Sequence, residues 1–255
     1  MALPASERAA WPRISVVTVV RNGERMLGAC LDSVAAQRYA ALEHVVVDGA
    51  SNDGTVDLLR RRSDARLRWV SERDGGIYDA MNRGTRLATG DYLLFLGADD
   101  ILLADLVGVA GRLKDPRTVY YGDAYWPGTH RLYAGRFGAA KLARRNICQQ
   151  AIFYPRAVFD RHAFDVRYRL QADWELNMRC FSDPAFRFEY MPVLVARYND
   201  RDGVSTVERD RAMEADYLRL LWRHFSPLIA LPLSALVVGG RLGRRVRLWR
   251  TDPKS

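Results

Sequence analysis

The stretch Ile14-Ser-Val-Val-Thr-Val-Val20 decides the fold of this chain, because it is an almost unbroken run of apolar and β-branched residues between turn-forming residues. Such a run is typical of a strand that is buried on both faces. Residues 24–37 follow with apolar side chains near helical spacing, and residues 43–48 form a second short apolar run that ends in Asp48. The sequence therefore predicts a strand, a helix and a second strand in that order.

The alternation of strand and helix continues up to residue 100. The sequence predicts helices at residues 55–62 and 77–88 and strands at residues 67–70 and 92–96. Strands that alternate with helices form a mostly parallel sheet that is covered on both faces. We therefore predict an α/β fold whose first half spans residues 14–100.

The pattern changes in the second half, residues 101–205. The sequence predicts a helix at 101–113, a hairpin of 119–126 and 131–137, a helix at 172–181 and a strand at 186–195. Helices are predicted again from about residue 206. These features indicate one domain at residues 1–205, with a mixed second half, and a helical C-terminal segment at residues 206–255.

The formal net charge of +9 is unevenly distributed. Residues 219–255 contain eight Arg or Lys residues and one acidic residue, so they carry +7 and leave only +2 for the first 218 residues. A protein whose body binds nucleic acid needs a basic face on that body. The near-neutral body therefore argues against a nucleic-acid partner.

The C-terminal segment combines an apolar stretch with a basic one. Residues 227–240 contain no charge, but they are interrupted by Pro232 and are shorter than the about 20 apolar residues that span a bilayer. Residues 241–250 read RLGRRVRLWR. Together, residues 227–250 predict contact with an anionic membrane surface. The alternative is a buried helix followed by a solvated tail.

The cellular location is predicted from two simpler features. Three scattered cysteines indicate a reducing compartment, and the N-terminus has no signal-peptide pattern. With the basic C-terminal segment, they predict a cytoplasmic protein that is peripheral on the inner face of the cell membrane.

Acidic residues follow three of the predicted strands. Asp48 ends the second strand, Asp74 follows the third, and Asp99-Asp100 follows the fourth. Ligands of an open parallel sheet bind beyond the carboxyl ends of its strands, so these residues predict a site for a cation and for hydroxyl-rich groups. Each has another interpretation as a helix cap, and Asp100 could cap a helix that begins at Ile101.

The glycine-rich loops do not match the common nucleotide motifs. Residues 49–55 have the glycine spacing of a phosphate-binding loop but lack its lysine, and no G-x-G-x-x-G follows the first strand. The sequence also lacks H-E-x-x-H, G-x-S-x-G and a Cys/His metal cluster. These absences weaken the dinucleotide, protease, esterase and zinc interpretations.

Four segments of the first half resemble a known family in content and in order. They are SVVTVVRN (15–22), VDGASNDGT (47–55), SERDGGIYDAMNRG (71–84) and ATGDYLLFLGADD (88–100). Together they resemble the family 2 glycosyltransferases of the GT-A fold, and most of all the bacterial enzymes of exopolysaccharide and lipopolysaccharide assembly. The resemblance becomes thinner between residues 101 and 206.

The resemblance implies an inverting transfer of a hexosyl- or N-acetylhexosaminyl-type sugar from a nucleoside diphosphate donor. The residues that it places at the donor are Thr18, Val19, Arg21, Asp48, Asp74, Asn82, Arg83 and Asp100. Asp99 matches the carboxylate that holds Mg²⁺ or Mn²⁺ on the diphosphate. A hard cation with oxygen ligands stabilises the negative charge that the leaving diphosphate gains.

In the second half, residues 171–176 resemble the segment that supplies the general base for the acceptor hydroxyl. Asp173 is the predicted base and Glu175 its reserve, while the other interpretation is that Asp173 caps its helix. The residues implied on the acceptor side are Gln149, Gln150, Trp174 and Glu175. Residues 198–205 resemble a glycine-rich loop near the diphosphate. The expected acceptor is a lipid-linked saccharide or an oligosaccharide, because the C-terminal segment would hold the enzyme at a membrane.

The chain departs from the family pattern at three positions. Arg21 stands where an aromatic residue is common, Gly97 replaces an Asp or Asn, and Gln149 stands where His is frequent. The Gly97 change need not abolish metal binding, because Mg²⁺ needs few protein ligands. Two alternatives stay open: a catalytically impaired module that binds nucleotide sugars, and a nucleotidyltransferase with a similar sheet.

Overall fold

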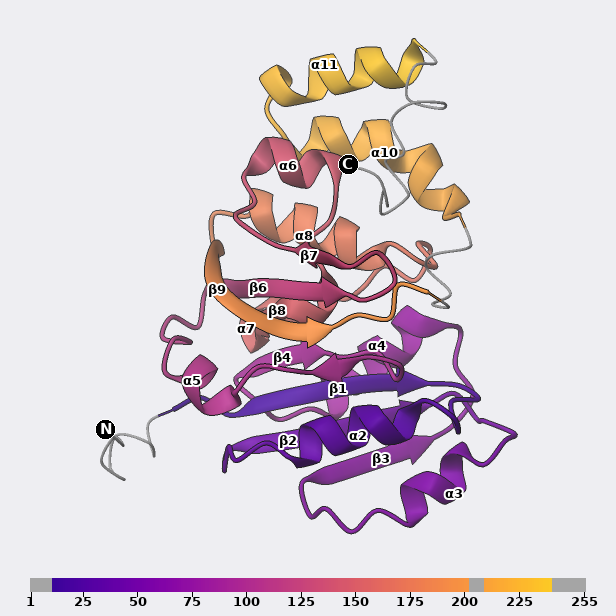
Figure 1. Cartoon of the computed structure of the whole chain (residues 1–255). Helices are drawn as coiled ribbons and strands as arrows, with labels where there is room; N and C mark the ends of the chain where they lie inside the picture. The colour runs from indigo at the N-terminus through magenta and orange to yellow at the C-terminus, as the bar shows by residue number, and fades with distance from the viewer. Residues whose placement is uncertain (1–10, 202–208, 240–255) are drawn as a thin grey trace.

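The computed structural model describes residues 11–201 and 209–239. Within them, nine strands form a sheet in the order β3-β2-β1-β4-β8-β6-β9-β5, with β7 paired to β6 (Figure 1). The strands of the first half run parallel to one another: β1 (Ile14–Val20), β2 (Leu42–Asp48), β3 (Leu67–Ser71) and β4 (Tyr92–Phe95). The prediction of a parallel first half built around residues 14–20 is confirmed, since β1 lies between β2 and β4.

The second half of the sheet mixes strand directions. β6 (Thr118–Trp126) is parallel to β9 (Arg187–Arg197) and antiparallel to β7 (Arg131–Tyr133) and β8 (Ile152–Pro155). β8 also pairs with β4 and so joins the two halves into one continuous sheet. The predicted hairpin and the predicted mixed second half are both confirmed.

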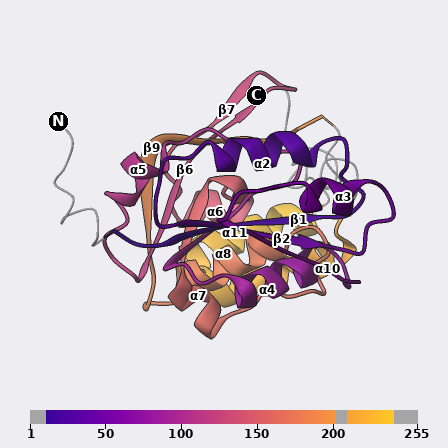
Figure 2. The ribbon, with the colours of Figure 1, turned by 90° about the horizontal axis from the view of Figure 1, so that it is seen from below.

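Helices cover both faces of the sheet (Figure 2). α2 (Leu27–Ala35) and α3 (Thr55–Arg60) lie on one face, and α4 (Ile77–Leu87) and α8 (Ala172–Ser182) lie on the other. The shorter or later helices are α5 (Leu106–Ala110), α6 (Ala139–Arg144), η1 (Gln149–Ala151), α7 (Arg156–Arg161), α10 (Arg211–His224) and α11 (Pro227–Val238). The approach of α4 to β1 requires Gly84, because a Cβ there would lie 2.4 Å from Cγ1 of Val17.

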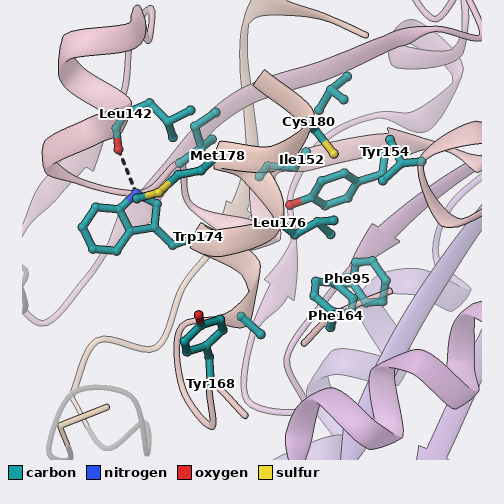
Figure 3. Packing of buried hydrophobic residues seen from close by; sticks show 14 of the residues in the cluster. Phe95, Leu142, Ile152, Tyr154, Phe164, Tyr168, Trp174, Leu176, Met178 and Cys180 are labelled. Atoms are coloured by element: carbon teal, nitrogen blue, oxygen red, sulfur yellow. Dashed lines mark hydrogen bonds between the residues drawn. The ribbon is translucent and has the colours of Figure 1, made fainter. Parts of the chain in front are cut away.

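The larger hydrophobic core lies between the sheet and helices α4, α8 and α10. Figure 3 shows Phe95 of β4, Tyr154 of β8 and Trp174 of α8 in this cluster. The rings of Trp174 and Tyr217 of α10 are both buried, with centroids 5.7 Å apart. α10 therefore belongs to the main core. The predicted boundary near residue 205 falls within residues 202–208, outside the described residues.

The prediction of a helix at residues 101–113 is wrong. The segment begins with strand β5 (Ile101–Leu102), antiparallel to β9, and only Leu106–Ala110 is helical. The backbone N–H of Leu103 also donates to the carbonyl of Val195 (2.8 Å), so pairing with β9 removes these residues from the helix. The helix cap is Asp105, whose carboxylate accepts from the N–H of Val107. Asp100 does not cap this helix.

The apolar stretch of the C-terminal segment forms helix α11, which packs on α10 and α6 (Figure 1). Ala230 and Leu233 face inward, whereas Leu228 is 89% exposed, Leu231 62% and Val238 77%. The helix therefore presents an apolar outer face. Among the described residues, the helices are all too short or too polar to cross a membrane. The basic residues 241–250 lie outside the described part of the chain.

Candidate functional site

The carboxyl ends of β1, β2 and β3 meet at one edge of the sheet, as the acidic residues after them predicted. The register pairs Val20 with Asp48, and Asp48 with Ser71. The loops that follow these strands therefore begin side by side. The loop after β4, which carries Asp99 and Asp100, leaves the sheet next to β1 at the same edge.

Hydrogen bonds join the loop after β1 to the loop after β2. The N–H of Asn22 donates to Oγ of Ser51 (2.7 Å), and Oδ1 of Asn22 accepts from the N–H of Asn52 (2.9 Å). Asn22 and Ala50 both have a φ of 55°, in the left-handed region that non-glycine residues rarely adopt. Such conformations persist only where the surroundings enforce them. The rim of the site is therefore held in one shape before any ligand arrives.

Asp48 is fully buried beneath this rim. Its Oδ2 accepts from the N–H of Ser51 (3.0 Å) and from Oγ of Ser71 (2.6 Å), and its Oδ1 accepts from the hydroxyl of Ser51. The carboxylate thus fixes the loop after β2 onto β3. Neither Ser51 nor Ser71 was predicted from the sequence. The Asp-x-x-Ser spacing is a local signal for Ser51, whereas Ser71 reaches Asp48 from the neighbouring strand.

Arg21, Gly49 and Asp74 converge at the open rim. A Cβ on Gly49 would lie 2.5 Å from Oδ2 of Asp74 and 3.4 Å from Cβ of Arg21, so a side chain at position 49 would displace the Asp74 carboxylate. Val19 is half-buried just below them on β1. Arg83 of α4 forms an ion pair with Glu72 (2.9 Å), the residue that follows β3. Besides Asp48, four of the predicted donor residues therefore gather at or near one edge of the sheet: Val19, Arg21, Asp74 and Arg83.

The two carboxylates after β4 have different environments. Asp100 is 1% exposed, and its oxygens accept from the N–H groups of Gly97 (3.1 Å) and Asn199 (2.8 Å). Burial, with a smaller contribution from the charge of Asp99, raises the pKa of Asp100 to about 7. Asp99 is only half-buried, and its Oδ2 accepts from Nδ2 of Asn199 (3.0 Å). Asp99 is therefore the more accessible carboxylate.

The unusual glycine at position 97 has a structural reason. A Cβ on Gly97 would lie 2.4 Å from Oδ2 of Asp100 and 3.0 Å from Oδ1 of Asp99. Because Gly97 has no side chain, the carboxylates of Asp99 and Asp100 are able to lie close to its backbone. The departure from the family pattern is therefore part of how this chain positions Asp99 and Asp100.

Asp173 lies in the first turn of α8 and is 9% exposed. Its Oδ1 accepts from the hydroxyl of Tyr78 (2.7 Å), and its Oδ2 accepts from Nδ2 of Asn146 (2.5 Å). Burial raises the pKa of Asp173 to about 6, although these hydrogen bonds and the N–H groups of the helix turn oppose the rise. The N-cap residue of α8 is Gln171, so Asp173 is not the cap of its helix. The carboxylate of Asp173 mainly accepts hydrogen bonds from the side chains of Tyr78 and Asn146.

Residues 146–150 connect the two acidic parts of the site. Asn146 contacts Asp173, while the side chain of Gln150 hydrogen bonds to Asp100 and accepts from Sγ of Cys148 (3.3 Å). Gln149 is buried and points the other way, toward the sulfur of Met81 (3.5 Å). One short segment therefore contacts both Asp100, which adjoins the predicted metal ligand Asp99, and the predicted base Asp173.

Besides Gln149, the structure turns four further predicted site residues away from this group. The hydroxyl of Thr18 is buried and lies 3.0 Å from Nε2 of His44. The side-chain amide of Asn82 hydrogen bonds to the backbone of Phe164: Nδ2 donates to the carbonyl (2.9 Å), and Oδ1 accepts from the N–H (2.9 Å). Trp174 points into the core, where Nε1 donates to the carbonyl of Leu142 (2.8 Å; Figure 3).

Glu175, the predicted reserve base, is the fourth of these residues. It forms an ion pair with Arg179 (2.8 Å), and its carboxylate is only 8% exposed. The side chains of Thr18, Asn82, Trp174 and Glu175 are thus committed to structural contacts. The contacts of Tyr78, Asn146 and Asn199 were not predicted, because they join segments that are distant in the sequence. Asn199 does belong to residues 198–205, which the resemblance placed near the diphosphate, and residues 202–205 of that loop lie outside the described residues.

A nine-stranded sheet with a parallel first half, helices on both faces and acidic loops at one carboxyl edge defines the GT-A class of fold. The sequence model of Glycosyl transferase family 2 matches residues 15–194. The chain therefore belongs to the family 2 glycosyltransferases and is an enzyme of that class. This membership replaces the nucleotidyltransferase interpretation.

Relatives at higher identity agree with the family. The chain is 42% identical over 210 residues to the PGL/p-HBAD biosynthesis glycosyltransferase of Mycobacterium bovis (strain BCG / Pasteur 1173P2), covering 78% of this chain and 82% of the relative. An equally similar protein of the same description occurs in Mycobacterium tuberculosis (strain ATCC 25177 / H37Ra). At 78% of this chain, the similarity necessarily extends into both halves of the domain.

Two solved structures share the fold. TarS residues 1–349 of S. aureus superpose with a TM-score of 0.67 at 16% identity, covering 91% of this chain and 72% of that one. The mannosyltransferase PcManGT of Pyrobaculum calidifontis, in complex with GDP-Man and Mn²⁺, has a TM-score of 0.60 at 20% identity, covering 96% and 85%. At these identities the comparison shows the fold alone.

Proposed function

We propose that this glycosyltransferase inverts the anomeric centre of a sugar that it moves from a nucleoside diphosphate donor to a saccharide acceptor, with Asp173 as the general base. The observation that carries the proposal is the segment 146–150, which touches Asp173 through Asn146 and Asp100 through Gln150. A single displacement needs a leaving-group site and a base on opposite sides of the reacting carbon. Because this segment contacts Asp173 and Asp100, it supports a base and a leaving-group site that belong to one active site.

The environment of Asp173 suits a base that works near neutral pH. Burial raises the pKa of Asp173 to about 6, so the carboxylate is ionised at pH 7 but is more basic than an exposed aspartate. A general base is most effective when its pKa is close to the working pH. Asp173 would accept the proton of the acceptor hydroxyl as that oxygen attacks.

The residues after β4 fit a divalent cation. Asp99 has an accessible carboxylate and would be the protein ligand, whereas Asp100 is occupied by the N–H groups of Gly97 and Asn199. The described residues contain no group of three or more His, Cys, Asp or Glu that could hold a metal without a substrate. One carboxylate together with diphosphate oxygens and water matches the sparse protein coordination of Mg²⁺. Mg²⁺ or Mn²⁺ would stabilise the charge of the departing diphosphate.

The nucleoside part of the donor is proposed to lie at the rim formed by Val19, Arg21, Gly49 and Asp74. Arg83 forms an ion pair with Glu72, whose side chain is exposed. The guanidinium is therefore able to exchange this carboxylate for a diphosphate. Structures of TarS contain UDP and UDP-GlcNAc, and the structure of PcManGT contains GDP-Man. These ligands support a nucleotide sugar as the donor of this chain.

The acceptor is proposed to be a lipid-linked saccharide at the inner face of the cell membrane. Helix α11 exposes Leu228, Leu231 and Val238, and Trp222 of α10 is 49% exposed nearby, with Nε1 bonded to Ser234 of α11. The basic stretch 241–250 follows directly in the sequence. An apolar face beside basic residues and Trp favours an anionic membrane interface.

A screen of donors tests the proposal. Thermal melting should be recorded with UDP-, GDP- and dTDP-linked sugars, each with and without Mn²⁺, because a ligand that binds the folded state raises its stability by mass action. One donor should raise the melting temperature only in the presence of the cation, and the raise should vanish in Asp99→Ala. No shift with any donor would count against a nucleotide-sugar site.

A further inference from the structure

A chain of buried polar side chains runs from strand β8 to Asp173. Oη of Tyr154 donates to Oδ1 of Asn177 (2.9 Å), and Nδ2 of Asn177 donates to Oδ1 of Asn146 (2.8 Å). Nδ2 of Asn146 then donates to Oδ2 of Asp173 (2.5 Å). Tyr154 and Asn177 are completely buried in the core between α8 and the sheet.

The ionised carboxylate fixes the direction of every hydrogen bond in this chain. A carboxylate only accepts, so Asn146 has to present its amide group to Asp173 and its carbonyl to Asn177. For the same reason Asn177 presents its amide group to Asn146, which leaves its carbonyl to the hydroxyl of Tyr154. All donors therefore point toward Asp173, and the chain matches the ionised state of that residue at every link.

Asn146 is also fixed from its other side. It lies in the loop between α6 and η1, and its backbone carbonyl accepts from the hydroxyl of Tyr133. Without Asn177, the half-buried side chain of Asn146 would be able to turn its oxygen toward Asp173, where it would repel the carboxylate. The buried part of the chain thus stabilises the orientation of Asn146 that the carboxylate of Asp173 requires.

We propose that Tyr154 and Asn177 are positioning residues that, through Asn146, hold the carboxylate of Asp173 in the orientation and charge state that proton transfer requires. This inference rests on the proposed role of Asp173 as general base. A polar chain in an apolar core costs stability unless each member is satisfied, and here each link satisfies the next.

The chain makes a prediction that a purely structural role does not. Each donor to a carboxylate favours its ionised form. Removal of Asn146 should therefore raise the pKa of Asp173 and move the acidic limb of the pH profile of kcat upward by about one unit. Tyr154→Phe removes only the distant hydroxyl, so the acidic limb of the pH profile should move upward by a smaller amount. We expect kcat to be about threefold to tenfold lower and the KM for the donor to be unchanged.

The matched control is Tyr217→Phe. Tyr217 is equally buried in the same core, and its hydroxyl donates to the carbonyl of Ala143 (2.8 Å), outside the chain. Tyr154→Phe, Tyr217→Phe and Asn146→Ala should be compared for kcat, donor KM, pH profile and melting temperature. Asn146 lies in a half-buried loop, so its variant keeps the test valid if Tyr154→Phe folds poorly. The proposal expects a shifted acidic limb in Asn146→Ala and Tyr154→Phe and an unshifted one in Tyr217→Phe.

A double-mutant cycle separates this inference from the proposed function. In an Asp173→Asn background, Tyr154→Phe should cause no further loss of rate, because the group that the chain positions is gone. If Asp173→Asn abolishes transfer but Asn146→Ala and Tyr154→Phe have the pH profile of Tyr217→Phe, the positioning role is refuted. If Asp173→Asn keeps the full rate, the proposed base itself is refuted, and the inference is refuted with it.

Discussion

Gly97 and Asp100 are packed so closely that a Cβ on the glycine would lie 2.4 Å from Oδ2 of the aspartate, whose oxygen already accepts from the N–H of Gly97. The carboxylate occupies the space that a side chain at position 97 would need. The conformation of the acidic loop after β4 thus depends on Gly97, which departs from the family pattern two residues before the predicted metal ligand Asp99.

The first prediction concerns this contact. Gly97→Asp, which restores the residue type expected from the family, should lower transfer about tenfold or more and destabilise the fold by roughly 1–3 kcal/mol, because it displaces Asp99 and Asp100. Gly138→Ala is the control, since a Cβ at Gly138 meets no atom within 4 Å. Activity assays and thermal melts of both variants measure the difference. A Gly97→Asp enzyme with higher activity would contradict the account of this loop.

The second prediction concerns the cation. Asp99→Asn keeps the size of the side chain and the neighbourhood of Asn199, but it removes the charge that we propose to hold the cation. Transfer should fall by about 10³-fold, and the Mn²⁺ concentration that gives half-maximal rate should rise. Kinetics at a series of Mn²⁺ concentrations measure both effects, with the melting temperature as a check on folding. A variant that needs no more metal than the wild type would remove Asp99 from the metal site.

The third prediction concerns the stability of the fold at low pH. Burial lowers the pKa of His44 from 6.5 to about 4, so the folded protein keeps this imidazole neutral where the unfolded chain already binds a proton. Above pH 6.5 the neutral His44 costs the folded state no stability. As the pH falls from 6.5 toward 4, the free energy of unfolding decreases by on the order of 3 kcal/mol in total, because the unfolded chain binds a proton that the folded protein does not. His44→Gln should therefore lose less stability than the wild type between about pH 7 and pH 5.

Denaturant unfolding at the two pH values measures this difference. The comparison depends on the change of the free energy of unfolding with pH, so a uniform loss of stability in His44→Gln does not affect it. Equal changes in variant and wild type would show that His44 does not control the acid sensitivity. Transfer activity at neutral pH should be retained, because the structure places His44 and its partner Thr18 in the core.

The fourth prediction concerns helix α11. Serine at Leu228, Leu231 and Val238 together should abolish binding to vesicles that contain anionic lipid and leave the melting temperature within a few degrees, because these side chains are exposed. Leu132→Ser is the control, since Leu132 is also exposed (58%) but belongs to strand β7. Co-sedimentation with vesicles measures binding. Retained binding by the triple variant would contradict a membrane contact through α11.

Much of the fold was predictable because its signals are local. The apolar run at residues 14–20 and the alternation up to residue 100 predicted the parallel half correctly. Residues 101–113 were predicted wrongly, because their apolar pattern fits a helix and a buried strand equally well and only the pairing with β9 decides between them. The outward-facing apolar side of α11 could not be predicted either, because it depends on which residues pack against α10.

The sequence predicted that acidic residues gather beyond the carboxyl ends of the strands, but it did not predict the side chains that hydrogen bond to them. Family segments located Asp99 and Asp173, but a segment does not tell which way each side chain points. Trp174 follows Asp173 directly, and the turn of the helix sends it into the core. Asn199 bonds to Asp99 from 100 residues away in the sequence, and such a contact leaves no local pattern.

The central claim is that Asp173 is the base of an inverting transfer, and Asp173→Asn tests it most directly. The asparagine keeps the volume of the side chain but cannot accept the acceptor's proton. The measurement is the rate of transfer beside the affinity for the donor, the latter from thermal shift or calorimetry with Mn²⁺. We predict a rate that is lower by about 10²–10⁴-fold with donor affinity within about twofold of the wild type. A rate that stays near that of the wild type, or a loss that equals the loss of donor affinity, would contradict the claim.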